Sequence, residues 1–165
     1  YKRQSRAIAD VPDGGCSEHQ LAACFDVRLG GEMDWSQSDP LLRTEDGRWL
    51  AENAWRYGVI RRYPPDQPEA AGWDSERLHF RYVGKAHAAA MHAAGYCLEE
   101  YLQALHRYGA LRLDGPQGKP CYILCAQMMK NGAAFVLPDG YEAAPSADNL
   151  GYAVCVLTGN QDSEG

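Results

Sequence analysis

The sequence predicts an α+β fold, and three stretches of the chain indicate it. Residues 85–108 are rich in Ala, Leu and Glu, which is typical of helix, whereas residues 75–84 alternate apolar and polar side chains as a strand does. After residue 109 short apolar runs are separated by Pro, Gly, Asp and Asn, which indicates strands and turns. With 165 residues the chain is long enough for one compact domain, or for a main domain with a small appended piece.

The first predicted strand follows a polar, turn-rich stretch at the N-terminus. Residues 21–29, LAACFDVRL, are largely apolar and stop at Gly30 and Gly31, which favours a strand over a helix. Asp26 lies inside this apolar run. Because burying an unpaired carboxylate is costly, we expect Asp26 to have a charged partner, a set of hydrogen bonds or a metal ion.

A helix is predicted next, over residues 47–58. Its aromatic and aliphatic side chains recur at roughly helical spacing, and it ends at Gly58, a natural helix stop. The following residues, VIRRYPP, predict a short extended segment, and the prolines begin a polar loop that we expect at the rim of a cleft.

The second strand and the main helices come after this loop. In the predicted strand at 75–84, His79 shares a face with Arg77 and Arg81 and not with the apolar side chains. The helical region at 85–108 is expected to break near Gly95 and to serve as scaffold.

The C-terminal part predicts three short strands, which lie at CYILCAQMM, AAFVLP and YAVCVLTG. We therefore expect a core over residues 1–108, shortened at its N-terminus, and a small β extension over residues 109–165. The boundary is expected near residue 110.

Composition and charge exclude several classes of protein. The formal charge is -6, and Arg61 and Arg62 are the nearest thing to a basic cluster, so we do not expect nucleic acid as a partner. No run approaches the roughly 18 apolar residues of a membrane span, so we expect no membrane contact by this segment. The six cysteines include no C-x-x-C pair, which leaves free thiols and disulfides as alternatives. Nothing indicates an oligomer.

Four residues offer the side chains of a catalytic zinc site. His19 and Asp26 are seven residues apart, and Glu76 precedes His79 by three. Two imidazoles and a carboxylate fill three positions of a tetrahedral zinc and leave the fourth for water, as in catalytic sites. Zinc lowers the pKa of its water from about 15.7 to about 7, so a further carboxylate is able to serve as base.

These spacings are short patterns that also arise by chance. The residue types are equally compatible with polar histidines at positions 19 and 79, an Asp26 paired with arginine and a Glu76 at the surface. Residue types and spacing alone therefore leave both interpretations open.

Three longer motifs favour the metal site. They are SEHQLAACFD, WLAENAWRYGVIRRYP, and SERLHFRYVG with CLEEYL after it. They resemble, in order, S-x-H-x-x-G-x-A-x-D, W-L-x-x-N-A-x-x-Y-G-F-x-x-R-Y-P and E-P-W-H-x-R-Y-V-G of the VanY-type D-alanyl-D-alanine carboxypeptidase family of zinc peptidases. The resemblance covers about residues 14–103, and several motifs in one order are far more specific than any one alone.

The resemblance implies a role for each motif residue. The family's zinc ligands fall on His19, Asp26 and His79, and its general base falls on Glu76. The motif serine falls on Ser17, expected to help hold substrate beside the metal, with a loop or cap hydroxyl as the alternative.

Other positions concern the cleft or depart from the family motif. Arg62, in the R-Y-P segment, is expected to support the substrate cleft and to orient acids behind the metal. Ala22 stands where the family has Gly, and Cys24 stands where it has Ala. Arg77 and Leu78 replace a Pro-Trp pair, and no residue is assigned to the arginine that stabilises the oxyanion in the family.

The resemblance also implies fold and chemistry. A small mixed or antiparallel sheet with helices on one face is expected to hold one zinc ion in a groove, with a short C-terminal β extension. Glu76 is expected to take the proton of a zinc-bound water and pass it to the departing amine. The implied substrate is a peptidoglycan stem peptide ending in D-Ala-D-Ala, which places the work outside the cytoplasmic membrane, behind a signal or anchor absent from this chain.

Three alternatives keep the same residues. A D-Ala-D-Ala dipeptidase and a cell-wall endopeptidase use the same metal site on other substrates. A non-catalytic, zinc-containing wall-binding module is the third, and the presence of Glu76 counts against it because a purely structural site needs no base.

Overall fold

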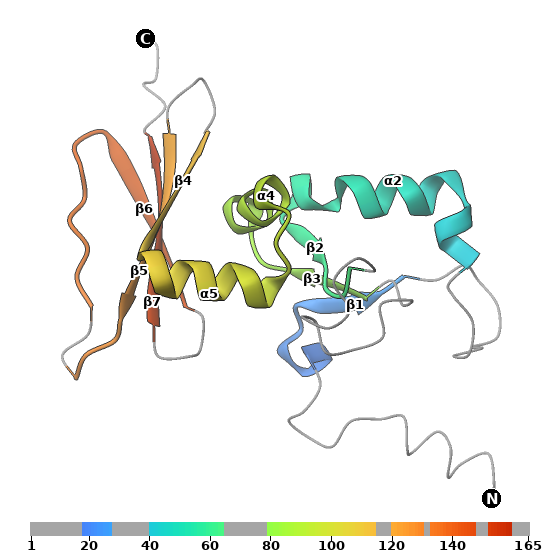
Figure 1. Ribbon diagram of the computed structural model, residues 1–165, viewed down its shortest axis with the longest axis horizontal. Coiled ribbons are helices and arrows are strands. Elements are labelled where there is room, and N and C mark those ends of the chain that lie inside the picture. Colours follow the sequence, from blue (N-terminus) through green and yellow to red (C-terminus); the bar gives the residue numbers. More distant parts are fainter. Residues whose placement is uncertain are drawn as a thin grey trace, which may run out of the picture.

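The computed structural model describes six stretches of the chain, and every structural statement below concerns them: residues 18–27, 40–64, 79–114, 120–130, 133–147 and 152–159. A four-stranded sheet stands at one end of the molecule (Figure 1). A smaller three-stranded sheet lies at the other end below α2, and α4 and α5 lie between the two sheets.

The first half of the described chain forms the smaller sheet and a helical layer. The sheet is antiparallel, with strand order β1-β3-β2. The strands of this sheet are β1 (Cys24–Asp26), β2 (Val59–Arg61) and β3 (His79–Tyr82). The helical elements of this half are η1 (Glu18–Leu21), η2 (Pro40–Arg43), α2 (Glu45–Asn53) and η3 (Ala54–Tyr57).

The second half forms two helices and the larger sheet. This sheet is also antiparallel, with strand order β4-β5-β7-β6. The elements are α4 (Lys85–Ala94), α5 (Leu98–Tyr108), β4 (Ala110–Asp114), β5 (Pro120–Gln127), β6 (Tyr141–Ala147) and β7 (Tyr152–Gly159).

Helix α5 has well-defined ends. At its start the side chain of Glu100 accepts a hydrogen bond of 3.0 Å from the backbone N–H of Cys97, which completes a capping box. At its end Gly109 takes a left-handed conformation with φ 69°, which suits glycine. Between these ends, Leu98, Tyr101 and Leu105 are buried on one face.

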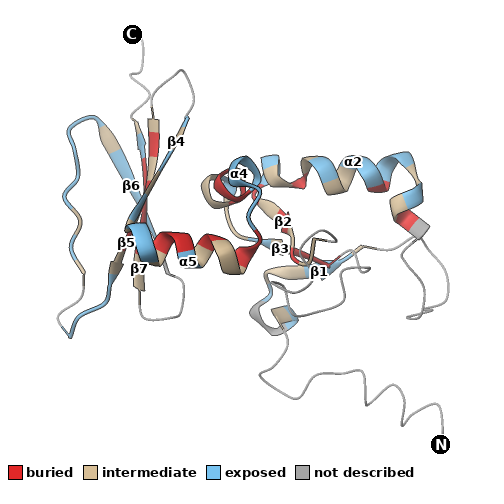
Figure 2. Ribbon diagram, in the orientation of Figure 1, coloured by how far each residue is buried: buried red, intermediate tan, exposed pale blue. Residues whose placement is uncertain are grey.

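One core joins the helices to the larger sheet. Met91 of α4 and Leu105 of α5 belong to the same buried cluster as Ile123 and Val156 of the sheet. Figure 2 shows buried residues along α5 and on the strands beside it. A second cluster, which includes the fully buried Phe80, packs the smaller sheet against the α2 layer.

The prediction of an α+β fold is confirmed, and so is the helix break near Gly95, where the chain takes φ 67°. The division at residue 110 remains a prediction. The core shared by α4, α5 and the larger sheet implies that two such parts would depend on one another for stability.

Several predicted boundaries are wrong. Of the strand expected over 21–29, the structure describes residues 21–27, and among these only Cys24–Asp26 form β1, while residue 21 belongs to the 3-10 turn at 18–21. The helix expected over 47–58 starts earlier, at Glu45, and tightens into η3 before Gly58. Thr44 sets its start, since the Thr44 hydroxyl accepts a hydrogen bond of 3.1 Å from the Gly47 N–H.

The strand predicted at AAFVLP, the second of the three C-terminal strands, is also wrong. Residues 133–138, AAFVLP, lie in no helix or strand, and Val136 in this run is 90% exposed, so the run does not form the predicted strand. The sheet instead uses β4 and β6, which the apolar runs did not reveal. All five described cysteines are free thiols, and Cys16 lies outside the described residues. No described helix is long and apolar enough to cross a membrane.

We expect Gly58→Ala to destabilise the fold more than Gly95→Ala does. Both glycines have positive φ, where alanine costs roughly 1–2 kcal/mol. A Cβ at Gly58 would also come within 2.9 Å of backbone atoms of Gly84 and Lys85, whereas a Cβ at Gly95 meets nothing within 4 Å. Chemical denaturation of both variants measures the difference, and equal losses of stability would contradict this close packing.

We expect His87 to make the fold less stable in acid. Burial lowers the pKa of His87 below its ordinary 6.5, and its Nδ1 lies 2.6 Å from the Tyr101 hydroxyl. The unfolded chain therefore takes up this proton first, so the stabilisation is complete above about pH 6.5 and is lost as the pH falls toward the folded-state pKa. The free energy of unfolding should fall more between pH 7.5 and pH 5.5 for the wild type than for His87→Gln. An equal fall would show that His87 does not contribute.

Candidate metal centre

Strand pairing brings two of the predicted ligands face to face. In the antiparallel ladder of β1 and β3, Asp26 lies directly opposite His79, so their side chains share one face of the sheet. The next pair, Phe25 and Phe80, points to the opposite face, where the rings stack with centroids 5.7 Å apart. The small sheet thus has an apolar face toward α2 and a polar face that carries Asp26 and His79.

His19 completes a cluster of three possible ligands. It lies on η1, and one donor atom from each of His19, Asp26 and His79 lies within 4.8 Å of the others. His79 Nδ1 is 2.7 Å from Asp26 Oδ1, and His19 Nε2 is 3.6 Å from Asp26 Oδ2. Ligands of a tetrahedral zinc lie roughly 3.4 Å from one another, given bond lengths of about 2.0–2.2 Å. The donor types therefore fit zinc, and the two distances of 2.7 and 3.6 Å lie on either side of this spacing.

The cluster is reachable from solvent on one side. The His79 side chain is 9% exposed, whereas those of Asp26 and His19 are 30% and 45% exposed. Tyr63 stacks on the His79 ring with centroids 5.5 Å apart and limits its rotation. A buried, fixed ligand beside exposed ones suits a site that a substrate must enter.

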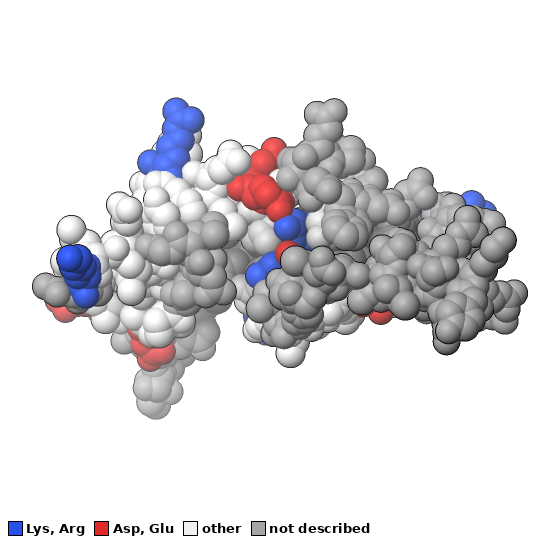
Figure 3. All heavy atoms as spheres, turned by 90° about the horizontal axis from the view of Figure 1, so that it is seen from below, with Lys and Arg blue, Asp and Glu red and all other residues white. Residues whose placement is uncertain are grey.

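A network of ion pairs lies next to the cluster. Glu18 Oε1 accepts hydrogen bonds of 2.9 Å from Arg62 Nε and 2.8 Å from Arg81. The other two nitrogens of Arg62 donate to both carboxylate oxygens of Glu99 on α5. Seen from below, acidic and basic side chains lie next to one another near the middle of the molecule (Figure 3).

The network changes how the groups bind protons. Burial alone would raise the pKa of Glu18, but hydrogen bonds from His79 and Arg62 and the charges of Arg62 and Arg81 lower it to about 2. The hydrogen bonds of His79 to Asp26 and to Glu18 raise the pKa of His79 to about 9. The carboxylates of Asp26 and Glu18 thus stabilise a positive charge at His79. A bound metal cation is also able to provide that charge.

A second set of possible ligands, Glu18, Cys24 and His79, also has donor atoms within 4.8 Å of one another. Burial and the negative charge of Glu18 raise the pKa of the Cys24 thiol to about 11. Because a thiol binds metal as thiolate, and Glu18 is already bonded to two arginines, this second set is the poorer site.

Residues 2–85 match the VanY family of D-alanyl-D-alanine carboxypeptidases, over about half of the chain. The chain belongs to this family. The match contains all three clustered ligands, and it confirms the resemblance that the motifs indicated.

Two enterococcal proteins similar to this chain support this assignment. A D-alanyl-D-alanine carboxypeptidase of Enterococcus faecium is 41% identical over 147 residues, which are 88% of this chain and 46% of that protein. One of Enterococcus faecalis is 44% identical over 61% of this chain and 34% of its own length. The chain thus spans less than half the length of these two relatives.

A solved structure resembles more of the fold. The vancomycin-resistance D,D-dipeptidase VanXYg, crystallised with a D-Ala-D-Ala phosphinate analogue, is 26% identical with a TM-score of 0.71. The similarity covers 86% of this chain and 58% of that one. It therefore extends well beyond the residues matched by the VanY family.

The predicted site residues have three different outcomes. His19, Asp26 and His79 come together, while Ser17 and Glu76 lie outside the described residues. Arg62 is buried at 8% exposure and is bonded to two carboxylates. This supports its expected part in orienting acids, and its contact with substrate stays a prediction.

Sequence reasoning missed three charged residues of the site: Glu18, Arg81 and Glu99. Each was present in a quoted VanY-type motif, in SEH, in HFRYVG and in CLEEYL respectively, but was given no function. The signal that could have identified them is that they are charged, whereas most other residues of these motifs are metal ligands or packing residues. Their partners lie 37 to 63 residues away along the chain, so spacing does not reveal the contacts.

The departure at Ala22 from the VanY motif has a structural consequence. Ala22 follows η1 with φ 53°, in the left-handed region that favours glycine, and its N–H bonds the carbonyl of His19. We expect Ala22→Gly to relieve strain next to His19 and to raise stability by about 0.5–1 kcal/mol, less than the full strain because glycine also loosens the unfolded chain. Denaturation curves measure this gain, and a loss of stability would show that the turn accommodates alanine without strain.

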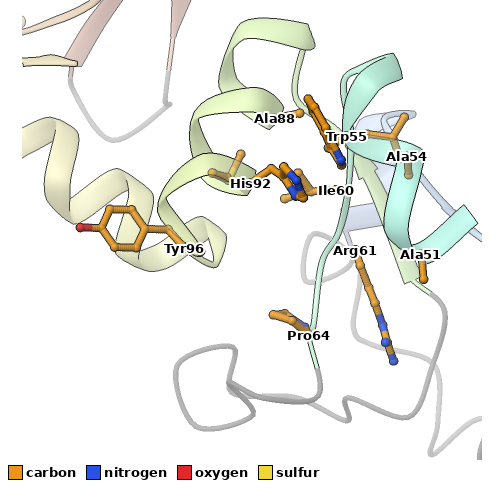
Figure 4. A pocket seen from close by; sticks show the side chains of 12 residues that line it. Ala51, Ala54, Trp55, Ile60, Arg61, Pro64, Ala88, His92 and Tyr96 are labelled. Atoms are coloured by element: carbon orange, nitrogen blue, oxygen red, sulfur yellow. The ribbon is translucent and has the colours of Figure 1, made fainter. Parts of the chain in front are cut away.

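A separate hollow lies between η3, β2 and α4, with a volume of about 190 Å³. Trp55 and His92 line it and stack with centroids 4.2 Å apart (Figure 4). None of His19, Asp26 and His79 is among its described lining residues. The hollow is therefore distinct from the candidate metal centre.

Proposed function

We propose that this chain carries the zinc site of a D,D-carboxypeptidase that removes terminal D-alanine from peptidoglycan stem peptides. The main support is the cluster of His19, Asp26 and His79, whose donor atoms lie within 4.8 Å of one another on a partly exposed face. Membership of the VanY family and the names of the enterococcal relatives support the substrate class.

In this proposal the three clustered residues hold one Zn²⁺ per chain. When bound, the metal would supply a water of lowered pKa and would polarise the scissile carbonyl. Glu76 removes the proton of the attacking water and returns it to the departing D-alanine amine. Ser17 contacts the substrate, and Arg62 supports the cleft from behind. A peptidoglycan substrate places this work outside the cytoplasmic membrane.

A second candidate function is cleavage of the dipeptide D-Ala-D-Ala. The resemblance to the D,D-dipeptidase VanXYg favours it, and so does a bifunctional dipeptidase and carboxypeptidase of Enterococcus gallinarum that is 40% identical over 53% of this chain. Both functions use the same metal centre and differ in which substrate the cleft accepts.

We expect Glu76→Ala to keep zinc and to lose turnover by about 10²–10⁴-fold, because it removes the base and no ligand. His79→Ala should lose both zinc and activity. Metal analysis and D-alanine release, from a pentapeptide ending in D-Ala-D-Ala and from the free dipeptide, measure these effects on the full-length protein.

The two substrates separate the candidates. Release from the pentapeptide alone supports the carboxypeptidase, and release from the dipeptide alone supports the dipeptidase. Zinc without release of D-alanine from either would contradict both and favour an endopeptidase or a binding module. Absence of zinc from the wild type would refute the metal centre itself.

A further inference from the structure

The two ring nitrogens of His79 face two different carboxylates. Nδ1 lies 2.7 Å from Asp26 Oδ1, on the side of the proposed zinc ligands. Nε2 lies 3.6 Å from Glu18 Oε2, on the other side of the ring. A histidine that binds metal through one nitrogen carries a proton on the other, and a carboxylate facing that proton fixes the tautomer and the ring orientation.

We propose that Glu18 is a positioning residue that holds the Nε2–H tautomer of His79, so that Nδ1 faces the metal, and that Glu99 holds Glu18 in place through Arg62. This inference rests on the proposed zinc site. It assigns functions to two glutamates that supply no ligand to that site.

Glu18 is held firmly enough for this task. Its Oε1 accepts hydrogen bonds from both Arg62 and Arg81. Its Oε2 accepts a hydrogen bond of 3.5 Å from the Cys24 thiol and faces His79 Nε2. Glu18 lies on a 3-10 turn of only four residues. Its position is therefore fixed mainly by the hydrogen bonds from the two arginines and less by the turn itself. Hydrogen bonds in which the donor or the acceptor is ionised are roughly twice as strong as hydrogen bonds between neutral groups.

Glu99 extends this support to helix α5. Its two oxygens take both terminal nitrogens of Arg62, which fixes the plane of the guanidinium and aims Nε at Glu18. Arg62 is 8% exposed, so losing one carboxylate leaves a buried cation incompletely paired and free to move. Glu99 therefore acts on His79 through two intermediate side chains.

The test compares zinc affinity in Glu18→Gln and Glu99→Gln, measured on the full-length protein by competition with a chromophoric chelator at fixed pH. Glutamine keeps the size of the side chain and removes its charge. We expect Glu18→Gln to weaken zinc binding about 10–100-fold, the usual effect of losing such a partner. Glu99→Gln should weaken it in the same direction by a smaller factor.

The matched control is Glu100→Gln. It makes the same charge change on the neighbouring residue of α5, whose carboxylate bonds the Cys97 N–H and not Arg62. We expect its zinc affinity to equal that of the wild type. A loss as large as that of Glu99→Gln would mean that the effect is general helix electrostatics, and would overturn the inference.

A second readout identifies the tautomer directly. ¹⁵N NMR of the zinc-loaded wild type should show His79 bound through Nδ1 and protonated at Nε2. Binding through Nε2 would overturn the proposal even if the affinities changed as expected. If thermal melts show that Glu18→Gln does not fold, the zinc affinity of Glu99→Gln and the His79 tautomer of the wild type still test the proposal.

The outcomes also separate this inference from the proposed function. A wild type that binds no zinc refutes the metal centre and this inference together. A wild type that binds zinc while both variants keep its affinity refutes only the positioning by Glu18 and Glu99. In that case the ion pairs of Glu18 and Glu99 stabilise only the fold and have no effect on zinc binding.

Discussion

The pairing of β1 with β3 is the constraint on which the candidate site depends. Asp26 and His79 are far apart in the chain, and the antiparallel register sets them opposite each other. A shift of one residue would turn Asp26 toward the apolar face and expose Phe25 to the polar one. The stacked pair of Phe25 and Phe80 opposes that shift, because Phe80 is fully buried against the α2 layer. The packing of the apolar face thus protects the geometry of the polar face.

The motifs predicted the ligand set but not the architecture around it. His19, Asp26 and His79 are recognisable because residue type and order are fixed by the chemistry of a metal site. Glu18 and Glu99 were missed because their importance depends on Arg62, which meets them only in the folded chain. Long-range ion pairs leave no periodic signal in a sequence, whereas ligand motifs and helical stripes do.

The same distinction explains the errors in the fold. Helices α4 and α5 were predicted well, since composition and the break at Gly95 are local signals. The apolar run at 133–138 was misjudged because a strand needs a neighbouring strand, and the sheet took residues 141–147 instead. β-propensity describes a fit to a pleated, half-buried surface, and the sequence does not reveal where that surface lies.

Helix α5 links the larger sheet to the metal centre. Leu105 and Tyr101 are buried in the core that includes Ile123, so the sheet fixes where this helix lies. Glu99 stands in the first turn of the same helix and bonds Arg62, which contacts Glu18 beside the ligands. A sheet whose described strands carry none of the clustered ligands is therefore connected to the site through one helix and one buried arginine. This connection gives a physical reason for the larger sheet to accompany the metal site: without the sheet, the packed face of α5 would be exposed and Glu99 would lose its fixed position.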